Sequence, residues 1–218
     1  MKFFERKPAS APSASADDRV AIGAEGQEVT HRLTRDLARA ESLARMLAAS
    51  RASAVVEVAD YLAGMYIYEW DRLSKFWEDR EAVEDYLQRI CQISPQRWHQ
   101  WIEFYDRERR GEEGRKPRRV FGSSKDSPAG RAPLEASHEL KAILRRAEEL
   151  APHHDTYDGR PIPILTSECV LLCIARNDGS AISQTLRDTG LDLLALEQAA
   201  RNPRHAPLHG NDEQEHPR

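Results

Sequence analysis

Residues 161–200 read PIPILTSECVLLCIARNDGSAISQTLRDTGLDLLALEQAA, and this stretch predicts three short helices. The first begins after Thr166 or Ser167, because a hydroxyl oxygen at a helix start accepts a hydrogen bond from the free N–H groups of the first turn. Residues 169–174 are apolar on every side of that helix, which predicts that it is buried. Turn-forming residues at 177–180 then end it.

The second and third helices of this stretch follow from the spacing of apolar residues and from two signals at the turn between them. Ala181, Ile182, Thr185 and Leu186 recur with helical periodicity. Gly190 stands where a helix end often needs a left-handed residue. Asp192 is a suitable cap for a third helix that carries Leu193, Leu196, Ala199 and Ala200.

The rest of the chain also has helical periodicity, and it predicts an all-α protein. We expect helices from Thr30 or Thr34 to about residue 50, over 53–77 with a break or bend at Gly64, over 81–91, from Ser94-Pro95 onward, and over 134–150. The aromatic residues near 98–105 have helical spacing and are expected in the core.

The opening stretch resembles one repeat of the amino-terminal domain of the Clp/Hsp100 unfoldases. Ser167-Glu168-Cys169 stands where those repeats have threonine, glutamate and histidine, and residues 170–174 stand for their leucine run. Further matches lie in the same register at Ala181, Leu186, Gly190-Leu191-Asp192-Leu193 and Leu196. The resemblance covers about a third of the chain. It implies a helical bundle with a Clp-type four-helix unit at the carboxyl end.

The amino-terminal domain in this family is a tandem of two such units, so the resemblance also implies a diverged first unit at about residues 53–108. A weaker alignment of the two halves places Glu69 opposite Glu168 and Leu73 opposite Leu172, with one residue inserted near Gln92. In this family the glutamate faces a surface site, and in some members it helps to bind phosphorylated arginine on substrates. The resemblance therefore implies that Glu168, and Glu69 if the repeat is real, bind a partner. The residues alone favour a capping role for Glu168.

Length, charge and composition place further bounds on function. The chain has 218 residues and a net charge of −4, which argues against attraction of the whole protein to nucleic acid or membranes. It has no signal peptide pattern and no apolar run long enough to span a membrane, so we expect a cytoplasmic protein. The cysteines, Cys91, Cys169 and Cys173, form no disulfide framework and are expected in a reducing compartment.

No motif for enzyme chemistry is present. The chain lacks the phosphate-binding loop of the Clp ATPase motor, and it has no nucleophile elbow or zinc-protease motif. Cys169 and Cys173, with His153 and His154 in the preceding loop, have the residue types of a zinc site, but two buried thiols explain the cysteines better. We therefore expect no catalytic residue, no cofactor and no metal.

These patterns divide the chain into five segments. We expect a disordered tail at 1–29, an N-terminal helical region at 30–108, a flexible basic linker at 109–133, a Clp-type helical repeat at 134–201 and a second disordered tail at 202–218. Residues 107–131 contain nine lysine or arginine residues together with glycine and proline, which is typical of a linker.

The sequence thus predicts a non-enzymatic interaction module. Such a module binds client proteins, or docks on a Clp-type unfoldase or protease as an adaptor or regulator. The alternative is a nucleic-acid-binding protein, in which residues 181–201 form a helix-turn-helix with Gly190 at the turn, and the basic linker contacts phosphates. Nucleic acid is the less favoured partner, because Leu191, Leu193, Leu194 and Leu196 leave few polar side chains to read bases. An enzyme ranks third.

Overall fold

A computed structural model describes residues 31–110, 134–152, 154–157 and 160–202. The amino-terminal part contains strands β1 (Arg32–Leu33) and β2 (Val55–Val56), helices α1 (Arg35–Ser50), α2 (Val58–Tyr68), α3 (Trp70–Leu73), α4 (Arg80–Ile90) and α5 (Pro95–Arg109), and the 3-10 turn η1 (Ser74–Phe76). The carboxyl-terminal part contains strands β3 (Glu135–Ala136), β4 (His154–Tyr157) and β5 (Arg160–Leu165), and helices α6 (His138–Leu150), α7 (Ser167–Ala175), α8 (Ala181–Asp188) and α9 (Leu193–Arg201). The fold is mostly helical, as predicted, but the short strands were not predicted.

The strands join the two parts of the chain reciprocally. β1, which precedes α1, runs parallel to β5, which precedes α7, and β4 completes this sheet as the antiparallel partner of β5. β3, which precedes α6, runs parallel to β2, which precedes α2. In both parallel pairs, a strand of one part therefore pairs with a strand of the other.

The helices begin where short polar side chains cap them. Thr34, Ser94, Ser137, Thr166 and Asp192 each accept a hydrogen bond from a backbone N–H in the first turn of α1, α5, α6, α7 and α9, respectively. The starts at Ser94-Pro95 and Asp192 were predicted. For α7, where the sequence left Thr166 and Ser167 open, the cap is Thr166, so Glu168 is the second residue of the helix.

A break or bend at Gly64 was predicted, and a break there is wrong. α2 runs unbroken through Gly64 and ends at Tyr68, and the chain then continues as α3 and η1. Gly64 allows α1 and α2 to approach closely, because a Cβ atom there would lie 2.5 Å from the carbonyl oxygen of Ala40. The glycine is needed for packing between two helices.

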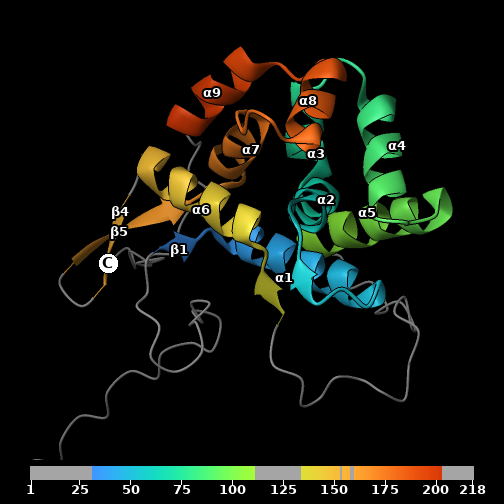
Figure 1. The fold of residues 1–218 in the computed structure, drawn as a ribbon, viewed down its shortest axis with the longest axis horizontal. Helices are drawn as coiled ribbons and strands as arrows, with labels where there is room; N and C mark the ends of the chain where they lie inside the picture. Colours follow the sequence, from blue (N-terminus) through green and yellow to red (C-terminus); the bar gives the residue numbers. More distant parts are fainter. Residues whose placement is uncertain (1–30, 111–133, 153, 158–159, 203–218) are drawn as a thin grey trace, which may run out of the picture.

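One hydrophobic core runs through both parts of the chain. Every residue of α2 and of α7 is buried, and Figure 1 shows α2 end-on near the middle of the molecule, with α1 beside it. The carboxyl-terminal part contributes buried leucine and isoleucine side chains to this core, among them Leu140, Ile143, Leu171, Leu172, Ile174, Leu186, Leu191 and Leu196. Leu144 is partly buried and packs against this core. The aromatic residues Trp98 and Trp101 are buried too.

The turns after α4 and after α8 have the same construction. Gln92 and Gly190 each have a positive φ, 54° and 78°, and the next residue donates its N–H to a carbonyl five positions earlier. In α4 that carbonyl belongs to Gln88, and in α8 it belongs to Leu186. The two turns match at a separation of 98 positions, whereas Glu69 and Glu168 are 99 positions apart, so the extra residue of the first half lies before Gln88 and not near Gln92.

Some predicted features lie outside the described residues, namely the tail at 1–29, nearly all of the linker at 109–133 and nearly all of the tail at 202–218. Arg109 and Arg110, assigned to that linker, instead end α5 and provide its C-cap. Within the described ranges, no helix is both long enough and apolar enough to cross a membrane.

Candidate functional site

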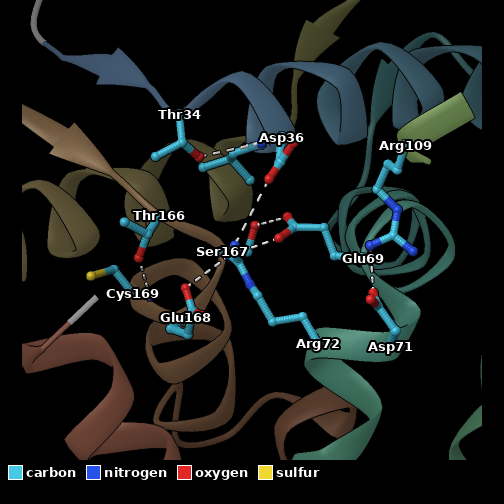
Figure 2. A network of polar contacts seen from close by, with 11 residues as sticks. Thr34, Asp36, Glu69, Asp71, Arg72, Arg109, Thr166, Ser167, Glu168 and Cys169 are labelled. Carbon is cyan, nitrogen blue, oxygen red and sulfur yellow. Dashed lines mark hydrogen bonds and ion pairs between the residues drawn. The ribbon is translucent and has the colours of Figure 1, made fainter. Parts of the chain in front are cut away.

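Arg72 lies at the centre of a network of polar contacts, shown in Figure 2. Its Nη2 donates a hydrogen bond to Oε2 of Glu168 at 3.0 Å, and the same nitrogen lies 2.7 Å from Oε2 of Glu69. Its Nη1 lies 3.9 Å from Oδ2 of Asp36. A single guanidinium therefore faces three carboxylates.

The Arg72 cluster (Asp36, Glu69, Arg72, Ser167 and Glu168) draws its members from distant parts of the chain. Asp36 lies in the first turn of α1, Glu69 separates α2 from α3, and Arg72 lies in α3. Ser167 and Glu168 begin α7. The hydroxyl of Ser167 donates a hydrogen bond to Oε1 of Glu69, which fixes the second oxygen of that carboxylate. The cluster thus joins the two parts of the chain.

The cluster has a buried end and an open end. The side chains of Glu69 and Glu168 are 2% and 9% exposed, whereas those of Arg72 and Asp36 are 31% and 33% exposed. The guanidinium therefore reaches inward from the surface toward two buried carboxylates. Arg72 and Asp36 form the more exposed end of the cluster.

Burial raises the pKa of Glu69 to about 7. Desolvation of the carboxylate is the main cause, and the negative charges of Asp36 and Glu168 raise the pKa further. The positive charge of Arg72 and the hydrogen bond from Ser167 act in the opposite direction. Glu69 is therefore poised between its neutral and charged forms near neutral pH.

Glu69 and Glu168, the two glutamates singled out from the sequence, contact the same guanidinium, although they lie at different places in the fold. Glu168 is near the start of α7, whereas Glu69 follows the end of α2. Thr166 supplies the side-chain cap of α7, while the carboxylate of Glu168 pairs with Arg72. The structure thus brings both residues together through Arg72.

The sequence pattern did not indicate that Arg72, Asp36 or Ser167 belongs to a site. Arg72 lies three positions after Glu69, a spacing that favours ion pairs in a helix, so this contact had a visible signal. The contacts of Arg72 with α1 and α7 had none, because they depend on how distant helices pack.

A second arginine near the cluster makes a separate set of contacts. Arg109, in the last turn of α5, donates hydrogen bonds to Asp71 and to Asp106. Its side chain is 20% exposed, less than that of Arg72. Arg109 is therefore a suitable reference residue for experiments on Arg72.

The cysteines are buried thiols. Burial raises the pKa of Cys91 to about 12 and that of Cys173 to about 11, and it also raises the pKa of Cys169. Such thiols resist ionisation and are poor nucleophiles. Among the described residues, no group of three or more His, Cys, Asp or Glu side chains is placed to hold a metal ion. His153, one member of the zinc hypothesis, lies outside those residues.

The segment considered as a helix-turn-helix folds as α8 and α9 with Gly190 between them. Leu191 and Leu196 face the core, whereas Leu194 is 68% exposed. On α9, Glu197 pairs with Arg201 and with Arg176, the residue that follows α7, so part of the local positive charge is already neutralised.

Comparisons of the chain with models of known protein families, with curated proteins and with solved structures find no match.

Proposed function

We propose that this protein is a non-enzymatic interaction module of the Clp amino-terminal type, and that it binds a polypeptide partner through the Arg72 cluster. The observation that carries the proposal is the contact of Glu69 and Glu168 with one guanidinium. These carboxylates accept a guanidinium within this chain, so the chemistry that the site offers a partner is recognition of arginine.

The arrangement of the two parts of the chain also supports this proposal. The resemblance implies a tandem of two helical units, and the reciprocal pairing of β1 with β5 and of β2 with β3 is what such a tandem would produce. The similar turns at Gln92 and Gly190 agree with it. The partner is then a client polypeptide, or a component of a Clp-type unfoldase or protease on which this module docks as an adaptor or regulator.

The test is binding of arginine-rich or arginine-phosphorylated polypeptides by the whole chain and by the Glu168→Gln variant. The substitution keeps the size of the side chain but removes its charge. Client binding should weaken by roughly 1–3 kcal/mol, the value of a charge-assisted contact. Glu197→Gln is the matched control, because Glu197 also pairs with arginine but lies outside the cluster.

If Glu168→Gln leaves client binding unchanged, or if Glu197→Gln weakens it equally, the cluster is not the binding site. Tight, salt-sensitive binding of DNA would favour the nucleic-acid alternative instead. In that case, neutralising Arg115, Lys116, Arg118 and Arg119 should weaken the binding.

A further inference from the structure

Arg72 fits its site incompletely. A guanidinium binds a carboxylate most strongly through two parallel hydrogen bonds. Here Nη2 of Arg72 contacts both Glu69 and Glu168. The Nε atom of Arg72 is buried without a hydrogen bond. Oε2 of Glu69 is also buried and receives no hydrogen bond, although it lies 2.7 Å from Nη2. Both partners thus keep unused hydrogen-bonding capacity.

The net charge of the cluster also indicates that Arg72 fits its site incompletely. Three carboxylates face one guanidinium, so the site has an excess of negative charge when Asp36, Glu69 and Glu168 are ionised. Arg72 reaches the site from α3, a helix of four residues, and its side chain is partly exposed. Asp36 lies at the exposed end and offers an alternative contact for the guanidinium.

We propose that Arg72 is an internal ligand of this cluster, and that an arginine side chain of a partner displaces it from Glu69 and Glu168. The displaced guanidinium turns outward to Asp36, while the incoming one binds the buried carboxylates with its full fork. Only the displacement step rests on the proposed function. Occupation of a guanidinium site by Arg72 is a property of the chain by itself.

An internal ligand lowers the apparent affinity for an external one, because the site is open for only a fraction of the time. Removal of Arg72 should therefore strengthen binding of a partner arginine, whereas removal of Glu168 should weaken it. A merely structural ion pair predicts the opposite for Arg72, since its loss would disturb the site and weaken binding.

The first experiment is chemical rescue of the Arg72→Ala variant. Thermal unfolding is measured with millimolar guanidinium chloride or N-acetylarginine amide, and N-acetyllysine amide serves as the control ligand. The midpoint temperature of Arg72→Ala should rise with concentration and saturate, as for ligand binding to the folded state. The rise should vanish in Arg72→Ala/Glu168→Gln and should not occur in Arg109→Ala. No rise in Arg72→Ala, or an equal rise in Arg109→Ala, would overturn the internal-ligand proposal.

A measurement on the unmodified chain covers the case in which Arg72→Ala does not fold. The Nε–Hε resonance of Arg72 should shift on addition of N-acetylarginine amide, whereas that of Arg109 should stay in place. If neither resonance moves up to about 100 mM ligand, a concentration that detects even very weak binding, the proposal is wrong.

The displacement step is tested with the same clients as the proposed function. Arg72→Ala should bind them about 5- to 150-fold more tightly, the usual range for coupling between two events in one protein. Rescue by the small ligands combined with unchanged or weaker client binding would overturn displacement. If no variant, nor the unmodified chain, binds any client, the proposed function fails even where chemical rescue succeeds.

Discussion

The backbone of Gly64 in α2 lies against the backbone of Ala40 in α1, so that a methyl group on Gly64 would come within 2.5 Å of the Ala40 carbonyl oxygen. It would also approach the Cβ atom of Ala44 to 3.2 Å. The two helices lie this close only because small residues face each other. Any side chain at position 64 must therefore push α1 and α2 apart.

Gly64→Ala should destabilise the protein, although alanine favours helix formation more than glycine. The gain in helix propensity is about 1 kcal/mol, whereas a clash with a buried backbone typically costs about 1–3 kcal/mol or more. Chemical denaturation should therefore show a net loss of stability. An equal or higher free energy of unfolding would mean that the helices have room to separate at this position.

Leu172 of α7 provides a test of the predicted core. Its side chain is buried in a helix that is surrounded by other elements on all sides. Leu172→Ala should lower the free energy of unfolding by about 2–5 kcal/mol, because the surrounding helices cannot fill the cavity. The exposed Leu194 on α9 is the matched control, and Leu194→Ala should change stability by less than about 0.5 kcal/mol. Similar losses for the two variants would contradict the burial of α7.

The two parts of the chain should remain associated after the connection between them is cut. β2 has its strand partner in β3 and β1 has its partner in β5, and the buried side chains of both parts form one core. A specific protease site inserted between Arg110 and Leu134 tests this. After cleavage, both fragments should elute together in size-exclusion chromatography and should unfold in one transition. Separation into two folded fragments would show that each part is an independent domain.

The sequence predicted the helices of this protein better than their contacts. The apolar spacing around Leu172 and the caps at Ser94 and Asp192 are local signals, and the structure has the corresponding helices. β1, β2 and β3 were missed because a strand of two residues has no periodicity of its own. Gly64 was misread because its reason for being glycine lies in α1.

In the candidate site too, local features were predicted from the sequence and long-range contacts were not. Glu168 was singled out from its place in a motif, whereas the contact of Arg72 with Glu168 is recognised only when α3 and α7 are seen side by side. An arginine in a charged helical segment looks like an ordinary surface residue in the sequence. Its role follows from long-range packing, which the pattern of apolar residues does not determine.

Ionisation of Glu69 gives the last prediction, a specific dependence of stability on pH. The pKa of this carboxyl is raised to about 7 in the folded protein, whereas an unfolded glutamate titrates near its ordinary value of 4.5. Between these values the folded state holds a proton that the unfolded state has lost. Stability contributed by Glu69 is therefore greatest below about pH 4.5 and declines as the pH rises to about 7.

Other carboxyl groups also titrate in this range, so the informative quantity is the difference between the unmodified chain and Glu69→Gln. The variant has no proton to lose, and Ser167 can still donate its hydrogen bond to the amide oxygen. From pH 5 to pH 8 the unmodified chain should lose up to about 3 kcal/mol more stability than Glu69→Gln, as measured by denaturation at each pH. The matched control is Glu84→Gln, because Glu84 lies outside the cluster and accepts a hydrogen bond from Tyr66. Parallel pH profiles for the unmodified chain and Glu69→Gln would mean that Glu69 is ionised throughout this range, held by Arg72 against the cost of burial.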